Sequence, residues 1–529
     1  MTEELESLKE SLMAGRLSRR EFLGRASALG FGAAAASMMP GLALAADKPI
    51  KGGHLKTGFA GGGSADSLDP TLATSDACFL NLRLFGETLV NTSASGQLEY
   101  RIAEEASSSD GVTWLFKIRN GVEFHNGKTL TAEDVVETIR RHSDEKSQSI
   151  AKGGLSQIDR LSTEGNTVKI SLKGANADFP FALSEIPLSI QPNGGKGDPA
   201  SGIGSGPYKL EGTPQAGVRY QFRKFANYWD PAIGHVEENE VLIINDATAR
   251  TGALQSGQVH MINLVDPKIV GRLKSAPGIS VKNVTGRSHY VFSMRTDTAP
   301  FDNEDLRMAL KLAIDRDEIV KKVLAGFGSV GNDMPINANY PFFDASIPQR
   351  RYDPEQAAAY YKKSGHDGSP IVLHVSDAVF SGATDAAQLF QQSAAKAGIP
   401  ISVQREPGDG YYTEVWSKKP FFVSLWAGRA TQDQVYSLTY LSTAPWNETH
   451  LKNAELDRLV LAARSELDPS KRQKLYSDVA NLLRDHGGTI AFAFNDFIDA
   501  VSNKLGGYNP DPNRALMNLM APIKCWLPA

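Results

Sequence analysis

Alternation of hydrophobic and polar positions predicts strands along most of this chain. In the segment 112–119, Trp114, Phe116 and Ile118 occupy every second position, which places them on one face of an extended strand. Similar runs bounded by turn residues predict further strands at 52–60, 167–172, 218–224, 371–375, 401–404 and around 490–494. The glycine-rich segment 202–206 predicts a turn that lets two backbone segments approach closely.

Helical periodicity becomes prominent after about residue 303. Leu306, Ala309 and Leu312 recur at three-residue spacing behind a cap at Asp302 or Asn303. Further helices are predicted at 315–325, from 353 onward, and at 384–397, 453–465 and 469–485, with an earlier one that begins at Thr129 or Thr131. Helices that alternate with strands in this way predict an α/β fold.

The length and charge of the chain limit the classes of protein to which it can belong. It has 529 residues and a formal net charge of −4, with acidic and basic residues interspersed. Roughly 480 residues remain after an export signal, too many for one hydrophobic core, so two or three domains are expected. No basic stripe of the kind that binds nucleic acid is present. No later stretch has the ~18 uninterrupted apolar residues that span a bilayer, so we expect a protein that is not membrane-inserted.

The first 45 residues have the order of a bacterial export signal. Arg19 and Arg20 precede a Phe-Leu pair, an alanine-rich apolar stretch follows, and small residues at 43–45 (Ala-Leu-Ala) form a cleavage site. The paired arginines indicate the twin-arginine route, which exports folded proteins. We therefore expect a signal peptide over 1–45 and a periplasmic mature protein.

Motifs that are typical of catalytic or cofactor sites lack their structural context. The G-x-G-x-x-G at 326–331 follows a predicted helix and does not open another, so we interpret it as a flexible loop at the helix exit. No paired metal-ligand spacing and no G-x-S-x-G elbow are present, so no metal, cofactor or catalytic activity is expected. Cys78 and Cys525 form either a disulfide or two unrelated buried thiols.

Nine segments resemble the large extracytoplasmic solute-binding proteins of ABC importers, family 5, which include dipeptide-, oligopeptide- and nickel-binding proteins. They follow the family's order across nearly the whole mature chain. The segments are 67–70 (Ser-Leu-Asp-Pro), 114–128, 131–135, 204–208 (Gly-Ser-Gly-Pro-Tyr), 227–229 (Asn-Tyr-Trp), 300–301, 306–310, 313–316 (Ala-Ile-Asp-Arg) and 352–355 (Tyr-Asp-Pro-Glu).

This resemblance implies an α/β, two-lobed periplasmic binding protein fold with mixed sheets, an extra subdomain in the first lobe and a hinge between the lobes. Lobe I would comprise 46–290 plus 496–529, with a subdomain at about 83–204, and lobe II would comprise 291–495. The implied function is a monomeric binding protein that captures a small solute and delivers it to ABC permease transmembrane subunits. A periplasmic hydrolase on the same scaffold and a solute-sensing or chaperone-like accessory protein are the alternatives.

The main departure from the family pattern begins at Trp426. Peptide binders of this family usually carry Trp-x-x-Asp here, where the Asp neutralises an α-ammonium, whereas this chain has Trp426, Ala, Gly428 and Arg429. A guanidinium is always charged and forms two parallel bonds with a carboxylate or phosphate. We therefore expect Arg429 to bind an acidic group of the ligand. Asp433 is either a further ligand contact or the structural partner of Arg429.

Other expected ligand contacts lie on both predicted lobes. Trp426 and Trp446 either pack against the body of the ligand or belong to the core. Ser75 and Asp76 follow the Asp-Pro pair at 69–70, where the family's first lobe contacts ligand. The ligand classes that remain open are a short or modified peptide, an opine-like amino-acid conjugate and an oligosaccharide.

Overall fold

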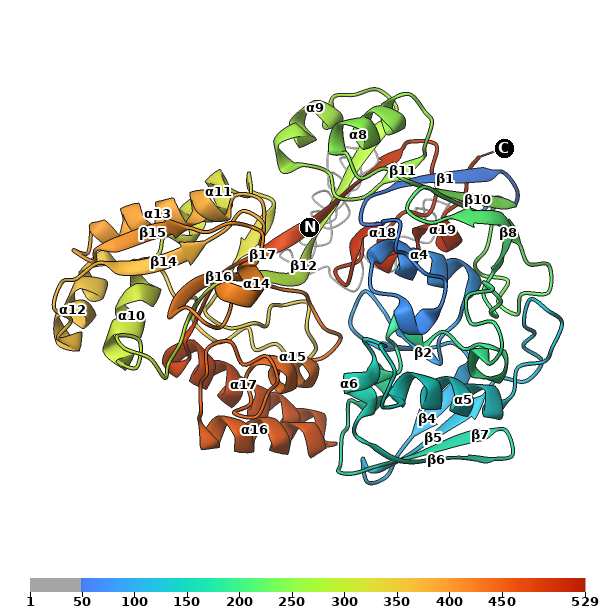
Figure 1. Cartoon of the computed structure of the whole chain (residues 1–529), viewed down its shortest axis with the longest axis horizontal. Helices are drawn as coiled ribbons and strands as arrows, with labels where there is room; N and C mark the ends of the chain where they lie inside the picture. The colour runs from blue at the N-terminus through green and yellow to red at the C-terminus, as the bar shows by residue number, and fades with distance from the viewer. Residues whose placement is uncertain (1–48, 529) are drawn as a thin grey trace, which may run out of the picture. The chain divides into compact units, whose positions relative to one another are not determined.

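The computed structural model describes residues 49–528, and Ile50–Ala529 form one compact unit. The predicted signal segment 1–45 lies outside the described residues. Within the compact unit, two groups of helices and strands lie on either side of two long strands, β12 (Ile279–Met294) and β17 (Thr489–Ser502) (Figure 1).

The largest sheet has eleven strands and extends through both groups. Ten of them follow one another in the order β15 (Ile401–Arg405), β14 (Ile371–Val375), β16 (Phe421–Trp426), β12, β17, β11 (Met261–Ile262), β1 (His54–Phe59), β10 (Glu238–Ile243), β9 (Arg219–Lys224) and β8 (Tyr208–Gln215). The eleventh, β13 (Gly328–Val330), pairs with β17. The strands predicted from alternation at the positions of β1, β9, β14 and β15 are confirmed.

The strands β12 and β17 carry the chain between the two groups. They pair antiparallel along most of their length, and their register shifts between Thr285 and His289. The two crossings predicted near residues 290 and 495 lie inside these strands. A register irregularity of this kind bends a strand and increases its twist locally.

Two sets of helices accompany the strands of the second half of the chain (Figure 1). The first set packs near the strands and comprises α10 (Glu304–Ala313), α11 (Arg316–Lys322), α12 (Pro354–Ser364) and α13 (Ala383–Ala395). The second set has a core of its own and comprises α15 (Gln432–Thr439), α16 (Ala454–Ser465) and α17 (Pro469–His486). Of the two predicted caps, Asn303 accepts a hydrogen bond from a backbone N–H of α10, and Asp353 and Asn453, the predicted first residues of two further helices, cap α12 and α16 in the same way. Helix α11 ends before the predicted residue 325, because Ala325 and Gly326 adopt a left-handed backbone that terminates a helix.

A four-stranded sheet with its own core lies in the first half of the chain. Its strands are β4 (Ala103–Ser107), β5 (Thr113–Ile118), β7 (Thr167–Leu172) and β6 (Ile158–Glu164), and α5 (Ala132–Ser143) packs against them. The predicted apolar face of β5, with Trp114, Phe116 and Ile118, is buried in this core. Thr131 caps α5 in a reciprocal pair with Asp134.

A second core in the first half surrounds α4 (Asp76–Phe85), a helix that the sequence patterns did not predict. The predicted turn at 202–206 approaches it closely, since a Cβ added to Gly204 would lie 2.2 Å from the carbonyl oxygen of Phe85. The remaining short elements are η1 (Pro70–Leu72), β2 (Val90–Thr92), β3 (Leu98–Tyr100), α6 (Lys152–Leu155), α7 (Phe179–Ala182), η2 (Ile186–Leu188), η3 (Pro192–Gly195), α8 (Ala247–Gln255), η4 (Pro267–Ile269), α9 (Val270–Lys274), α14 (Tyr411–Glu414), α18 (Ala515–Asn518) and α19 (Ala521–Lys524).

Two sequence interpretations are settled by these elements. The G-x-G-x-x-G segment 326–331 is not simply a flexible loop: its middle residues form β13, which hydrogen-bonds to β17 and so has an ordered partner. Cys78 and Cys525 are both free and buried in the same core, so the alternative of two buried thiols is confirmed.

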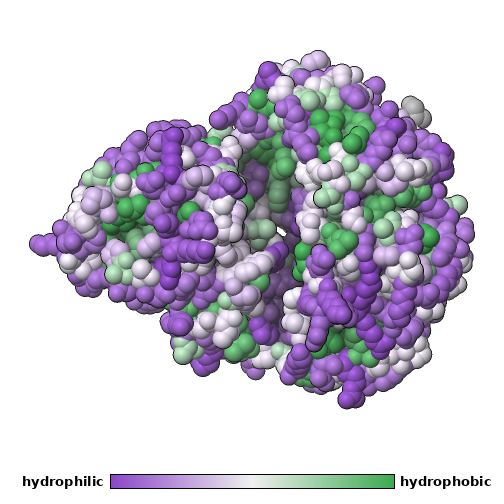
Figure 2. Space-filling model, in the orientation of Figure 1, coloured by the Kyte–Doolittle hydropathy of each residue, from purple (hydrophilic) through white to green (hydrophobic). Residues whose placement is uncertain are grey.

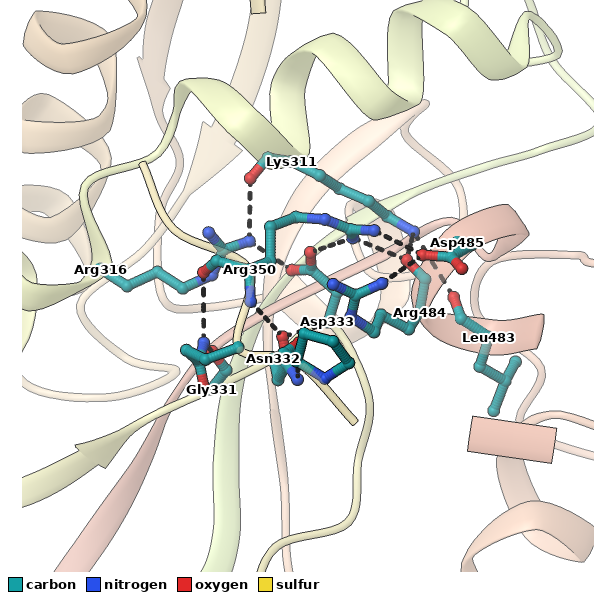
Figure 3. A network of polar contacts seen from close by, with 11 residues as sticks. Lys311, Arg316, Gly331, Asn332, Asp333, Arg350, Leu483, Arg484 and Asp485 are labelled. Atoms are coloured by element: carbon teal, nitrogen blue, oxygen red, sulfur yellow. Dashed lines mark hydrogen bonds and ion pairs between the residues drawn. The ribbon is translucent and has the colours of Figure 1, made fainter. Parts of the chain in front are cut away.

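A buried ion network lies between α10, α11 and the end of α17 (Figure 3). Asp333 is fully buried and accepts hydrogen bonds from Arg316 at 2.5 Å and from Arg350 at 2.6 Å. Lys311, also fully buried, donates to the main-chain carbonyl of Arg484 at 2.8 Å. Burial raises the pKa of Asp333, but the two guanidiniums outweigh it and hold the pKa below its usual range.

Candidate functional site

Three of the predicted site residues lie at the end of β16 and in the loop that joins it to α15. Trp426 is the last residue of β16, and Gly428 and Arg429 follow it. A Cβ added to Gly428 would lie 2.3 Å from the Cβ of Arg287 on β12, so only glycine allows the loop to pass so close to that strand. The sequence therefore fixes the position from which Arg429 extends.

The backbone of Arg429 is held on both sides. Its N–H donates to the Tyr340 hydroxyl at 3.1 Å, and its carbonyl accepts from Nη1 of Arg287 at 3.2 Å. The Arg287 guanidinium in turn lies 4.9 Å from the centre of the Tyr340 ring. The half-buried side chain of Arg429 forms no ion pair within residues 49–528. A positive charge without a protein partner, carried on a backbone that is held in place, is suited to bind an anion.

Asp433 is engaged elsewhere. It lies in the first turn of α15, where its carboxylate accepts from Nε of Arg464 at 2.9 Å and from the Ser437 hydroxyl at 3.0 Å. The side chain is almost fully buried. The predicted alternative of a structural Arg429–Asp433 pair is therefore wrong, because Arg464 on the neighbouring helix α16 supplies the partner.

Trp426 and Trp446 lie together, with their ring centres 6.1 Å apart, and Trp446 is 46 % exposed. Both Trp426 and Trp416 donate their indole N–H to the buried carboxylate of Glu448, at 2.9 and 2.6 Å. Burial raises the pKa of Glu448, and the hydrogen bonds that it accepts offset this only in part. The carboxylate thus fixes two indole rings that border an exposed aromatic surface.

Ser75 and Asp76 lie on another element, at the start of α4. The Ser75 hydroxyl caps this helix by accepting from the Cys78 N–H at 3.1 Å, and it donates to Asp66 at 2.7 Å. Asp76 forms an ion pair with Arg514 from the C-terminal segment. The structure therefore brings Trp426, Gly428, Arg429 and Trp446 into one group and places Ser75 and Asp76 in a second.

The turn between β2 and β3 connects these two groups. Asn513, beside Arg514, donates from its side-chain amide to the carbonyl of Ser93 at 2.9 Å. Farther along the turn, a Cβ added to Gly96 would lie 2.8 Å from Nη2 of Arg287, and Nη1 of the same arginine binds the backbone carbonyl of Arg429. Figure 2 shows the surface hollowed in this region, between α14 and α15 on one side and α4 on the other.

Sequence reasoning missed four residues of this region: Arg83, Arg287, Glu448 and Arg514. The sequence does contain a signal for Arg83, because this charged residue interrupts the mostly apolar run Leu-Asn-Leu-Arg-Leu-Phe at 80–85. A charge in a buried helix requires an explanation. The other three come from segments with no distinctive pattern. Their roles depend on contacts with residues that are far away in the sequence.

The family comparison decides what kind of protein carries this arrangement. The model of bacterial extracellular solute-binding proteins, family 5 (middle), matches residues 97–448. The chain belongs to this family. Such solute-binding proteins are periplasmic or extracellular and serve ABC importers, so the sequence-based expectation of a solute-binding role in transport is confirmed.

Individual relatives agree with this family and fold. This solute-binding protein is 25 % identical to the glutathione-binding protein GsiB of Pectobacterium atrosepticum over 426 residues, which are 77 % of this chain and 82 % of GsiB. It also resembles HbpA2 from Haemophilus parasuis, with a TM-score of 0.78 and 20 % identity, covering 90 % of this chain and 100 % of HbpA2. The binding protein AgaA of A. tumefaciens in complex with agropinic acid gives a TM-score of 0.74 and 21 % identity, covering 90 % of this chain and 99 % of AgaA. These structural likenesses confirm the predicted fold class.

Within residues 49–528 of this solute-binding protein, no helix is long and apolar enough to cross a membrane. No group of three or more His, Cys, Asp or Glu side chains there is arranged to hold a metal ion.

Proposed function

We propose that this protein binds a small acidic solute between two lobes and delivers it to the transmembrane subunits of an ABC permease. The proposed lobe I is 46–290 plus 496–529, with a subdomain at about 83–204, and lobe II is 291–495. The distribution of hydrophobic cores supports this division. One large core lies wholly within residues 292–493, whereas the core around α4 combines residues 55–261 with residues 501–525. The strands β12 and β17 would then form the hinge.

The main reason to expect an acidic solute is the unpaired guanidinium of Arg429. Its backbone is fixed by Tyr340 and Arg287, its guanidinium has no carboxylate partner within the described chain, and Asp433 is already paired with Arg464. A peptide-like or opine-like acid supplies the missing carboxylate, and the adjacent Trp426 and Trp446 suit its apolar part. A relative named for glutathione and a structural neighbour that holds agropinic acid support these two classes.

Calorimetric titration of the mature protein tests this proposal. The probes are glutathione, dipeptides, an opine and a neutral oligosaccharide, compared for the parent protein and for Arg429→Ala. We expect the variant to bind the acidic probe at least about tenfold more weakly, because a charge-assisted bidentate pair is lost. Arg405→Ala is the control, since Arg405 is an exposed arginine at the end of β15.

Three results would contradict parts of the proposal. Equal affinity of Arg429→Ala and the parent removes the role of Arg429. Preferential binding of the neutral oligosaccharide overturns the acidic class. Turnover of a bound probe, in place of thermal stabilisation without chemical change, favours a hydrolase.

We also propose that the protein is exported by the twin-arginine route and acts as a monomer. The support is the Arg19-Arg20 motif with its apolar stretch and cleavage site, which lies outside the described residues. Replacement of both arginines by lysine should leave the precursor in the cytoplasm of the host, as measured by cell fractionation. Periplasmic recovery of that double variant at the parent level would contradict the route.

A further inference from the structure

Arg83 is a buried guanidinium that lacks a carboxylate partner. It lies in the last turn of α4 and is 7 % exposed. Nη1 donates to Oδ1 of Asn91 at 2.5 Å, whereas Nε is buried without any hydrogen-bond partner. None of the carboxylates in residues 49–528 lies within 4.0 Å of this side chain.

An unpaired buried charge is expensive, since removing an ion from water costs several kcal/mol that only a partner can offset. Arg101, in the same part of the molecule, shows the usual solution: it pairs with Glu87 at 2.8 Å and with Asp230 at 2.9 Å. Glu87 forms its ion pair with Arg101, and its charge offsets the burial of Arg83 only in part. Burial lowers the pKa of Arg83 to about 10, which leaves the group charged at neutral pH.

A second guanidinium lies along the same face of α4. Asp76, Phe79 and Arg83 are spaced three and four residues apart, so they share one face of this helix. Arg514 pairs with Asp76, and its Cζ lies 5.0 Å from the centre of the Phe79 ring. Its side chain is about one-third exposed, so solvent and a small solute can reach it.

The C-terminal segment that carries Arg514 is held in an unusual conformation. Four consecutive non-glycine residues, 516–519, have positive φ angles, and a left-handed turn costs roughly 1–2 kcal/mol per residue. The buried Asp499 supports this turn by accepting from the Leu516 N–H at 2.8 Å. Backbone strain of this kind persists only where surrounding contacts enforce it, and it concentrates at functional sites.

We propose that Arg83 and Arg514 form a second oxyanion subsite, which binds a carboxylate or phosphate of the solute whose first acidic group is bound by Arg429. The inference rests on the proposed function and sharpens it, because it requires a solute with two acidic groups. Arg83 donates to Asn91 on β2, and Asn513, beside Arg514, donates to Ser93 in the turn that follows that strand. Gly96 of the same turn packs against Arg287 beneath the Arg429 loop, so the turn 93–97 links the two subsites.

The experiment removes Arg429 first, so that only the second subsite remains. The melting temperature of mature Arg429→Ala protein is measured in sodium acetate, sodium phosphate and sodium chloride at equal ionic strength. We expect acetate or phosphate to raise Tm by about 1 °C or more above chloride in a concentration-dependent manner. The added variant Arg83→Met should abolish that rise, Arg83→Lys should restore part of it, and Arg405→Met should leave it unchanged.

The acetate and phosphate arms distinguish a carboxylate subsite from a phosphate subsite. An equal rise with and without Arg83→Met overturns the subsite, and so does the absence of any rise with both anions. Because Arg429 is absent from every protein in this series, the result does not depend on whether Arg429 binds solute. Failure of the proposed function and failure of the subsite are therefore read from separate measurements.

Discussion

Two groups of arginines lie inside this protein, and their charges are neutralised in different ways. In the network of Figure 3, Arg316 and Arg350 share the buried carboxylate of Asp333 at 2.5 and 2.6 Å. By contrast, Arg83 and Arg429 have no ion-pair partner in residues 49–528, and the hollow between α14, α15 and α4 is seen in Figure 2. Burial lowers the pKa of Arg83 to about 10.

The difference separates a structural use of arginine from a binding use. Around Asp333 the chain itself supplies a carboxylate for two guanidiniums, although Nε and Nη1 of Arg316 remain without a hydrogen-bond partner. Around Arg83 and Arg429 it supplies positive charge and leaves the negative charge to another molecule. Breaking a matched network should therefore destabilise the protein, whereas removing an unmatched charge should affect binding first.

The largest expected effect is on the matched network. Asp333→Asn leaves Arg316 and Arg350 buried next to a neutral amide, so we expect the free energy of unfolding to fall by about 3–5 kcal/mol. Urea denaturation followed by circular dichroism measures it. Asp317→Asn is the control, since Asp317 is exposed on α11 and its replacement should change stability by less than about 0.5 kcal/mol. A loss for Asp333→Asn as small as that of the control would mean that the network does not depend on its carboxylate.

The sequence predicted the regular elements of this fold well where a local signal exists. The helices predicted behind Asn303, from 353 and from 453 begin there, because the side-chain oxygens of Asn303, Asp353 and Asn453 accept from free N–H groups three residues on. The helix α4 and the long strand β12 were missed. Helix α4 is buried on nearly every side, so it lacks the polar face from which an amphipathic helix is recognised.

The candidate site was less predictable, because its pairings join distant parts of the chain. The Trp-x-x-Arg run drew attention to Arg429, but the partner of Asp433 is Arg464, thirty-one residues away. Likewise, 438 residues separate Asp76 from Arg514. A local motif can suggest a charged contact, whereas the identity of its partner follows only from the packing of helices such as α15 against α16.

The smallest expected effect has the opposite sign and concerns Arg83. In the absence of solute, Arg83→Met removes a buried charge, retains an unbranched apolar side chain and leaves Asn91 bonded to Thr88 at 2.9 Å. We therefore expect the free energy of unfolding to rise by about 1 kcal/mol, because the desolvation penalty is relieved. Arg101→Met is the matched control and should destabilise, since it leaves Glu87 buried without its cation. If both variants lost stability to the same extent, Arg83 would be a structural arginine like those around Asp333, and the contrast between the two groups would not hold.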